Sequence, residues 1–254
     1  MKKPKVSIVT PSVRPDRIAL VDKSLSNQTY KNFEWLICGP EILRKKFEAR
    51  IKHNKYTYLG NPPPKKGMYW DLNFSYNRMF KKARGELIVS LQDSIYIPPL
   101  GIKKFWEAYV DKGKRALFSG VGDQYDQLDE YGKPINKVWD DPRKTDKYGS
   151  FYECYPNDME WNWAAFPRSA IFDIGGMDEK LDFLGFGGDQ LQVCERWGEA
   201  GYNFWLDQTN ESFTLRHGRP KDWDKNHVLF NGAYDKRKVE LKGLGKWPIL
   251  DYLK

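Results

Sequence analysis

Two short segments of the chain combine charged and polar side chains in patterns that suit a phosphorylated ligand. In TPSVRPDR, Pro11 stiffens a loop and Arg14 is placed to meet a phosphate. In QDS, the Asp93 carboxylate lies between Gln92 and a serine. Carboxylates with oxygen-bearing neighbours suit hard cations that bridge diphosphate oxygens, although an isolated Asp is also a common turn residue. Together the two segments favour a site for a nucleotide.

A third segment, FGGDQ, and a histidine farther along the chain add candidate reactive groups. Gly187 and Gly188 would let the backbone pass close to a ligand, and they place Asp189 and Gln190 at the start of a helix. An acidic residue at that position is also an ordinary helix cap. His217, in LRHGR, is a candidate metal ligand.

Helical and strand patterns alternate along the chain and place these segments. Strands are predicted over residues 5–9, 33–38, 56–59, 87–91, 116–121 and 202–206, and helices over residues 40–51, 72–84, 102–109 and 189–200, with one more between the first two strands. This alternation predicts an α/β fold with a mostly parallel central sheet flanked by helices. Ligands bind such sheets at the carboxyl ends of the strands, where Arg14 and Asp93 fall.

The length and composition predict a single domain. A chain of 254 residues with 40% hydrophobic side chains can bury one sizeable core. Residues 123–162 lack periodicity and are predicted to form a long irregular insertion.

Charge and cysteine usage restrict the partners and the compartment. The excess of 42 Lys and Arg over 34 Asp and Glu gives a net charge of +8, which favours anionic partners or serves solubility alone. Three scattered cysteines fit a reducing compartment. No apolar run approaches the ~20 residues of a membrane span, and the opening run is too short for a signal peptide. We therefore expect a cytoplasmic protein, whose basic face could still contact a membrane.

Five groups of motifs occur in an order that resembles a known family. They are KVSIVTPSVRPDR with SLSNQTYKNFEWLI, then SYNRMFKKARGELIVSLQDS, IGGMDE, FGGDQ and LRHGR. In this combination the chain resembles family 2 glycosyltransferases over residues 5–99. Residues 161–219 are similar to the β-1,4-galactosyltransferase and polypeptide N-acetylgalactosaminyltransferase groups. The resemblance implies a single, Rossmann-like GT-A domain that binds a nucleotide sugar together with Mn²⁺ or Mg²⁺. Residues 1–99 would then form the half that binds the nucleotide sugar, and residues 100–254 the half that binds the acceptor.

The resemblance also assigns roles on the donor side. QDS stands where the family has Asp-X-Asp, so Asp93 alone keeps a carboxylate, and His217 matches the histidine that completes the metal site. The segment from Cys38 to Glu41 stands where the family often has an Asp pair that contacts uracil, which leaves the identity of the base open. The residues implied to bind the donor are Pro11, Arg14, Asn77, Arg78, Gln92, Asp93 and Arg219.

On the acceptor side, FGGDQ matches a motif whose acidic residues hold the acceptor hydroxyl and remove its proton. Asp189 keeps the acid, whereas Gln190 stands where many inverting members have their base, so the stereochemistry is open. We expect both residues to be catalytic. The residues expected to bind the acceptor are Trp161, Trp163, Gly187, Gly188 and Asp189.

These observations predict a metal-dependent glycosyltransferase that moves a sugar from a nucleotide sugar, with uridine diphosphate the expected nucleotide, to a hydroxyl of a glycan. One alternative acceptor is a hydroxymethylated base in modified DNA, contacted by the basic and aromatic tracts at residues 137–147, 161–163 and 219–225. A second alternative is a non-catalytic module that binds a nucleotide sugar or a glycan.

Overall fold

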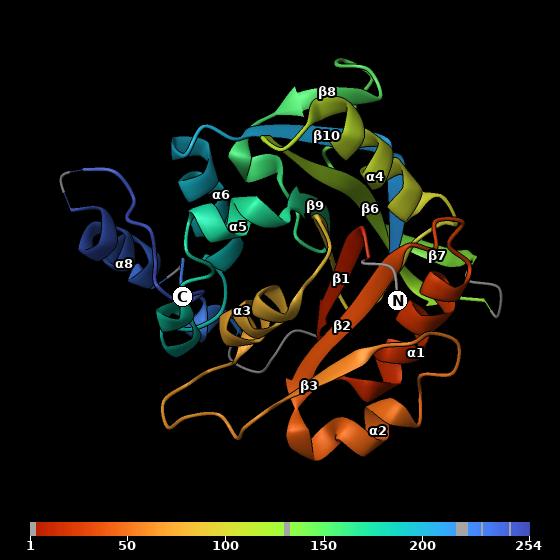
Figure 1. Ribbon diagram of the computed structural model, residues 1–254, viewed down its shortest axis with the longest axis horizontal. Helices are drawn as coiled ribbons and strands as arrows, with labels where there is room; N and C mark the ends of the chain where they lie inside the picture. The colour runs from red at the N-terminus through yellow and green to blue at the C-terminus, as the bar shows by residue number, and fades with distance from the viewer. Residues whose placement is uncertain (1–3, 130–132, 217–222, 230, 244) are drawn as a thin grey trace.

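The computed structural model describes residues 4–129, 133–216, 223–229, 231–243 and 245–254. Figure 1 shows the arrangement of its helices and strands. In chain order they are β1 (Val6–Pro11), α1 (Pro15–Ser26), β2 (Phe33–Pro40), η1 (Glu41–Leu43), α2 (Arg44–Glu48), β3 (Thr57–Asn61), α3 (Leu72–Lys82), β4 (Leu87–Leu91), β5 (Ile95–Tyr96), α4 (Gly101–Lys112), β6 (Ala116–Leu128), β7 (Pro134–Trp139), β8 (Phe151–Cys154), η2 (Pro156–Asp158), β9 (Trp163–Pro167), α5 (Arg168–Asp173), η3 (Glu179–Phe183), α6 (Asp189–Glu199), β10 (Asn203–Leu215), α7 (Trp223–Asn226) and α8 (Ala233–Lys242).

The ten strands form one mixed sheet in the order β3-β2-β1-β4-β9-β6-β10-β5, with β7 paired to β6 and β8 to β10. The predicted α/β class is confirmed. A mostly parallel sheet is wrong, because β5, β7, β8 and β9 run antiparallel to the strands they pair with. Parallel pairing is confined to β3-β2-β1-β4 and to β6 with β10. The chain enters the antiparallel strands through loops and turns rather than helical crossovers.

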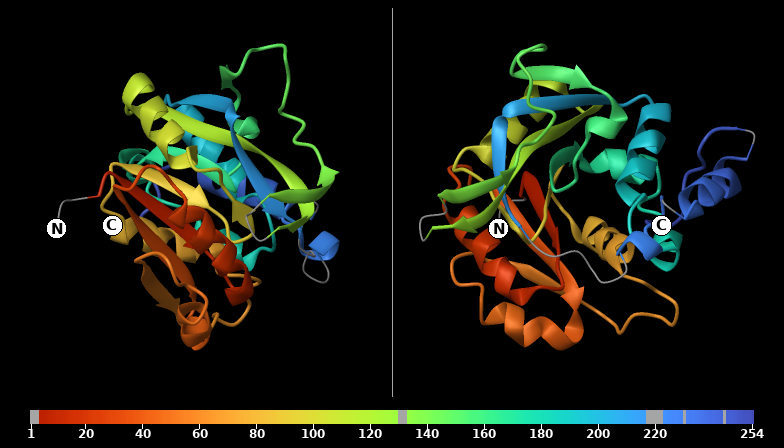
Figure 2. Two further views of the ribbon diagram at one scale, coloured as in Figure 1. Left: turned by 90° about the vertical axis from the view of Figure 1, so that its right-hand side faces the viewer. Right: turned by 180° about the vertical axis from the view of Figure 1, so that it is seen from behind.

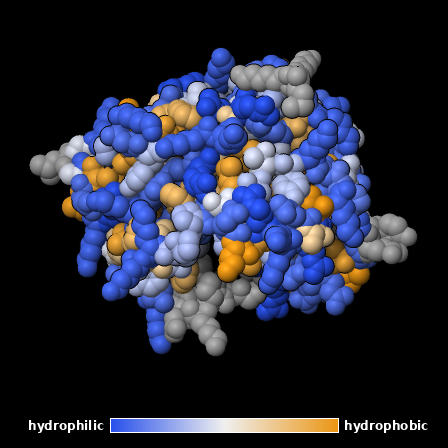
Figure 3. All heavy atoms as spheres, turned by 60° about the horizontal axis from the view of Figure 1, so that its bottom comes forward, coloured by the Kyte–Doolittle hydropathy of each residue, from blue (hydrophilic) through white to orange (hydrophobic). Residues whose placement is uncertain are grey.

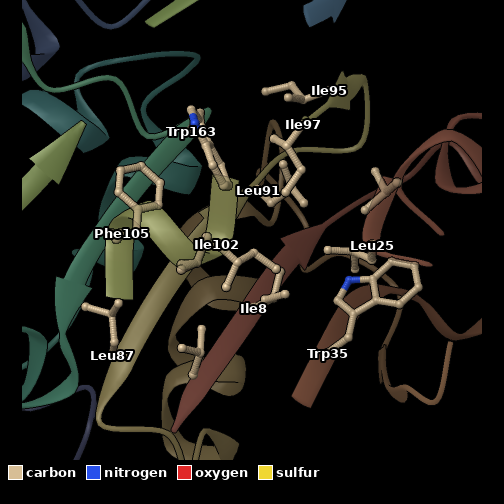
Figure 4. Close-up of a cluster of buried hydrophobic side chains, with 14 of the residues drawn as sticks. Ile8, Leu25, Trp35, Leu87, Leu91, Ile95, Ile97, Ile102, Phe105 and Trp163 are labelled. Atoms are coloured by element: carbon tan, nitrogen blue, oxygen red, sulfur yellow. The ribbon is translucent and has the colours of Figure 1, made fainter. Parts of the chain in front are cut away.

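Helices cover both faces of the sheet. Side chains alternate along each strand, so Val6 and Ile8 of β1 join one core cluster and Val9 joins the other. Helices α1, α2 and α4 pack into the first cluster, and α3, α5 and α6 into the second. In Figure 4, Ile8 and Trp35 of neighbouring strands meet Leu25 of α1 and Ile102 of α4. The apolar side chains that recur with strand or helix spacing in the sequence are therefore buried between the sheet and the helices on each of its faces.

The segment predicted to be an irregular insertion, residues 123–162, contains regular structure. It holds the end of β6, all of β7 and β8, and η2, and Figure 2 shows it along one side of the molecule. Most of β7 is exposed, so it has no apolar alternation to reveal it. Its pairing with β6 is supported by charge, because the Asp123 carboxylate lies 2.9 Å from both Lys137 Nζ and Lys144 Nζ.

None of the helices in the described part of the chain combines the length and the hydrophobicity that a membrane span requires. The face viewed in Figure 3 is mostly hydrophilic, with hydrophobic side chains in small separate patches. Such scattered apolar groups are normal for a globular surface.

Candidate functional site

The loops after β1 and β4 meet at the point where the strand order of the sheet reverses direction. Strand β1 lies between β2 and β4, and its crossover to β2 uses α1 on one face of the sheet. The connection from β3 into β4 uses α3 on the opposite face. A crevice at the carboxyl ends of strands is expected where successive crossovers leave on opposite faces. Arg14 and Asp93 follow these two strands and lie at that point.

Arg14 and Asp93 form a bidentate ion pair. Arg14 Nη2 lies 2.6 Å from Asp93 Oδ1, and Arg14 Nε lies 3.1 Å from Asp93 Oδ2. The Ser12 hydroxyl donates to Oδ2 at 2.6 Å and the Ser94 hydroxyl to Oδ1 at 3.2 Å. The Asp93 side chain is 3% exposed, whereas that of Arg14 is 37% exposed. The buried carboxylate therefore binds the guanidinium of a side chain that stays partly exposed.

The surroundings of Asp93 do not fit a divalent cation. Its two oxygens already accept the four hydrogen bonds just described. The guanidinium also places a positive charge where a metal ion would bind, and like charges repel. Within the described part of the chain, no group of three or more His, Cys, Asp or Glu side chains could hold a metal ion. The Mn²⁺ or Mg²⁺ site expected at Asp93 thus lacks support from its neighbours.

The expected metal ligand His217 and the expected donor residue Arg219 lie outside the described residues. The chain that leads to them does reach the site. The Leu215 backbone amide donates to the Ser94 carbonyl at 2.7 Å, and β10 pairs with β5 just beyond Asp93. Pro11, the last residue of β1, is buried at the edge where the loop begins.

Asn77 and Arg78 serve different parts of the molecule. Neighbouring helix residues point about 100° apart, so one side chain cannot share the direction of the next. Asn77 is 2% exposed and binds the Met177 backbone, accepting from its amide at 2.8 Å and donating to its carbonyl at 3.0 Å. Its contacts are structural and do not reach the donor-side loops, contrary to the expectation.

Arg78 instead joins a polar network at the carboxyl ends of β2 and β3. Its Nη1 donates to the Gly60 carbonyl at 2.6 Å and to Asn61 Oδ1 at 2.7 Å. Asn61 Nδ2 donates to Asp71 and Ser75, each at 2.6 Å. This edge is continuous with the loop after β1, because the Ser12 backbone amide donates to the Cys38 carbonyl at 2.9 Å. Arg78 therefore lies where a ligand bound at the β1 loop can extend.

Tyr76 of α3 links the donor-side residues to the acceptor-side ones. Its hydroxyl lies 2.9 Å from the Ser90 hydroxyl, and Gln92 is a further hydrogen-bond partner. Burial raises the pKa of Tyr76, and the negative charges of Asp189 and Asp93 raise it further. The Tyr76 phenol is therefore close enough for both carboxylates to affect its pKa.

Asp189 begins α6 after a glycine turn. Gly187 and Gly188 have φ of 94° and 81°, values that L side chains rarely adopt, and a Cβ on Gly187 would lie 2.7 Å from His227 Nε2. The protein itself, rather than a ligand, thus accounts for the glycine at this position. Burial raises the pKa of Asp189 to about 6, although its own backbone amide and that of Gln190 lower it. A carboxyl with this pKa can exchange a proton near neutral pH.

Gln190 and the two candidate tryptophans are structural. Gln190 Oε1 accepts from the Trp161 backbone amide and its Nε2 donates to the Met159 carbonyl, both at 3.3 Å. Trp161 is 1% exposed and stacks on Trp197. Trp163 is 2% exposed and packs on a phenylalanine of α4, as Figure 4 shows. Both indoles are too buried to stack on an acceptor, so the structure gives their expected acceptor-binding role no support.

An open cavity of about 520 Å³ lies elsewhere, between the start of α1 and α2, and is lined by Val13, Pro15, Asp16, Leu43, Lys46, Ala49 and Arg50. Its ion pair between Arg50 and Asp16 has side chains 57% and 82% exposed. Solvated groups of this kind orient a ligand weakly. We therefore place the candidate site at the buried Asp93 pair.

Three residues of the site were not predicted from the sequence. Ser12 stands inside the first loop, and its position directly after a strand was the available signal. Tyr76 matched the apolar face of its helix, which conceals its hydroxyl. Asp182 precedes FGGDQ in the chain; it is fully buried, and burial raises its pKa to about 7, with the charge of Asp189 contributing.

Comparison of the chain with protein-family models and with curated proteins finds no match. Function is therefore inferred from the geometry of the site and from the order of the motifs.

Proposed function

We propose that this chain is a glycosyltransferase with a GT-A-type fold, which moves a sugar from a nucleotide sugar, with uridine diphosphate as its nucleotide, to a hydroxyl of a glycan. The observation that carries the proposal is the convergence of two kinds of group at one sheet edge. Arg14, held by Asp93, offers positive charge to a diphosphate. Asp189, near Tyr76 on the other side, offers a carboxyl that can take a proton.

In this proposal the donor lies across the loops after β1 and β4. Its diphosphate faces Arg14, and its nucleoside extends toward Arg78 and Asn61 at the ends of β2 and β3. The sugar then lies between Arg14 and Asp189, with its anomeric carbon toward the acceptor. Positive charge fixed beside the diphosphate stabilises the charge that grows there as the sugar departs, which is often the largest catalytic effect.

Asp189 would receive the proton of the acceptor hydroxyl. With a pKa of about 6, the carboxyl is mostly ionised at neutral pH and still basic enough to accept that proton. Its place at the start of α6 holds it against the sheet edge, because Gln190 ties the same helix end to the segment before β9. Gln190 thus acts as a positioning residue.

The described contacts favour a glycan over DNA as the acceptor. In the basic tract at residues 137–147, Lys137 and Lys144 pair with Asp123, and Arg143 pairs with Asp141 at 2.5 Å. Side chains already neutralised in this way contribute little to phosphate binding. The tract at residues 161–163 is largely buried, as described above.

The test is release of nucleoside diphosphate from a panel of nucleotide sugars, with and without oligosaccharide acceptors, alongside binding of each donor by calorimetry. We expect one donor to bind and its sugar to appear on an acceptor. Asp189→Asn should abolish transfer while leaving donor affinity within about twofold, since the change removes only the proton acceptor. Asp111→Asn, at an exposed position on α4, is the matched control and should transfer normally.

Donor binding with no transfer to any acceptor and no hydrolysis would favour a binding module instead. Transfer that survives Asp189→Asn unchanged would remove Asp189 from the mechanism. Absence of binding by every nucleotide sugar would contradict the proposed function itself.

A further inference from the structure

The geometry points to Arg14, held by Asp93 and Ser12, as the cation that receives the departing diphosphate, so that sugar transfer proceeds without a divalent metal ion. This inference rests on the proposed function and concerns how the same site works. It replaces the metal expected from the motif order with a side chain of this protein.

The hydrogen bonds of Asp93 are the first support. A carboxylate that binds a metal ion must direct a lone pair at it. Asp93 directs both oxygens at Arg14, and the Ser12 and Ser94 hydroxyls occupy the remaining acceptor positions. With a side chain only 3% exposed, Asp93 meets its ligands inside the protein. It is therefore built to orient a guanidinium.

The state of the guanidinium is the second support. Two of its nitrogens, Nε and Nη2, bind Asp93, and the side chain remains 37% exposed. Its other donors thus remain available to oxygen atoms of a ligand. A planar guanidinium binds phosphate oxygens with defined geometry and stays charged at any physiological pH. Held in place before the ligand arrives, it needs no reorganisation during the reaction.

The backbone around Arg14 helps to hold this residue in place against Asp93. The Ser12 hydroxyl also accepts from the Arg14 backbone amide at 3.1 Å, so one serine binds both members of the pair. The next residue, Pro15, begins α1 and restricts the backbone after Arg14. The serine and the proline therefore restrict the backbone at Arg14.

The chemical step balances without a further reactant. The bond between the anomeric carbon and the diphosphate oxygen breaks, and its electron pair leaves with the diphosphate. The acceptor oxygen forms the new bond to that carbon, and its proton passes to the Asp189 carboxylate. Arg14 exchanges no proton; it neutralises the charge gained by the diphosphate. Asp93 and Ser12 are positioning residues.

The experiment measures two quantities in the presence of a chelator and again with added Mn²⁺. One is the affinity for free nucleoside diphosphate by calorimetry, and the other is kcat and KM for sugar transfer. We expect wild-type protein to bind and turn over its donor in chelator, with less than a threefold gain from Mn²⁺. Arg14→Ala should lower kcat about 100-fold or more, the scale seen when one oriented donor to a developing charge is lost.

Two further variants separate charge from orientation. Arg14→Lys should keep part of the diphosphate affinity but lose most of kcat, because an ammonium cannot bind Asp93 and a phosphate with the same fork. Asp93→Asn should lower kcat more than it raises KM. Added guanidinium ion should partly restore binding to Arg14→Ala, whereas a merely structural defect would not respond.

Arg84→Ala is the matched control. Arg84 also binds a carboxylate, that of Glu34, with Nε and Nη2 at 2.8 and 2.7 Å. This pair lies at the amino ends of β2 and β4, away from the loops that follow β1 and β4. The Arg84→Ala variant should leave diphosphate affinity and kcat unchanged.

Transfer that stops in chelator and returns with Mn²⁺ would overturn the inference while supporting the proposed function. Unchanged diphosphate binding by Arg14→Ala would also overturn it, and a wild-type protein that binds no nucleotide sugar would overturn both.

Discussion

Asp182 and Asn73 are joined by two hydrogen bonds across 109 positions of the sequence. Asp182 Oδ1 accepts from the Asn73 backbone amide at 3.1 Å and from its side-chain amide at 2.8 Å, and Oδ2 accepts from the Phe74 amide at 3.0 Å. The Asp182 carboxyl thus caps the start of α3 from the segment that leads into FGGDQ. A helix start otherwise leaves its first amides without partners.

The pH dependence of stability should report this carboxyl. Burial raises the folded-state pKa of Asp182 to about 7, from about 3.9 in an unfolded chain. The folded state therefore binds the extra proton between these values, and the free energy of unfolding falls as pH rises from about 4 to about 7. The contribution is on the order of 4 kcal/mol at about 1.4 kcal/mol per pKa unit.

Urea unfolding at several pH values checks this prediction. Asp182→Asn should flatten the curve, so that the variant gains stability relative to wild type as pH rises. Asp111→Asn should leave the curve unchanged, since that side chain is 68% exposed. A wild-type protein whose stability rises from about pH 4 to about pH 7 would contradict the assignment.

The rate of sugar transfer should carry the signature of Asp189. Its pKa of about 6 means that the base is ionised above that pH. We expect kcat/KM to rise with pH through about 6 and then level off, because this parameter reports groups of the free enzyme. Asp189→Asn should remove the rise together with the activity. A rise centred near pH 9 would assign the proton transfer to another group.

Neighbouring residues of α3 should give opposite results. Asn77→Ala would leave the buried amide and carbonyl of Met177 without partners, at a cost of about 3 kcal/mol in the free energy of unfolding. Donor affinity of the folded variant should be unchanged. Arg78→Ala should instead raise the donor KM about tenfold with a smaller change in stability. Thermal unfolding and steady-state kinetics on both variants decide whether the two roles are separate.

Some strands of the sheet could be predicted from the sequence and others could not. The β1, β2 and β4 regions were predicted within two or three residues, because their apolar runs are local. Strand β9 was not predicted, because all five of its residues are buried and its sequence has no alternation of apolar and polar side chains. Strand β7 escaped because most of it is exposed.

Within the site, residue type predicted Arg14, Asp93 and Asp189 as candidates but not their partners. The pairing of Arg14 with Asp93 spans 79 positions and depends on β1 lying beside β4. The roles of Trp161 and Trp163 could not be read from type, because a tryptophan stacks equally well on a sugar or on another ring.

The C-terminal helix α8 should depend on one ion pair. Arg237 Nε lies 2.6 Å from Asp178 Oδ2, with side chains 5% and 0% exposed, and the Tyr252 hydroxyl donates to the same carboxylate at 3.0 Å. Arg237→Leu would leave the Asp178 charge buried without its cation, at a cost of about 3 to 5 kcal/mol. We expect faster amide exchange across α8. Lys236→Leu, on the exposed side of the helix, should leave exchange unchanged.

Strand β9 determines when β4 and β6 can be joined into one sheet during synthesis. It pairs with β4 on one side and β6 on the other, so both of those strands keep an open edge until residues 163–167 have left the ribosome. Open strand edges recruit other chains. A nascent chain that stalls between β6 and β9 would therefore expose the unpaired edges of β4 and β6, which promote aggregation, and would need a chaperone. Once β9 has emerged, it can pair with both of these edges.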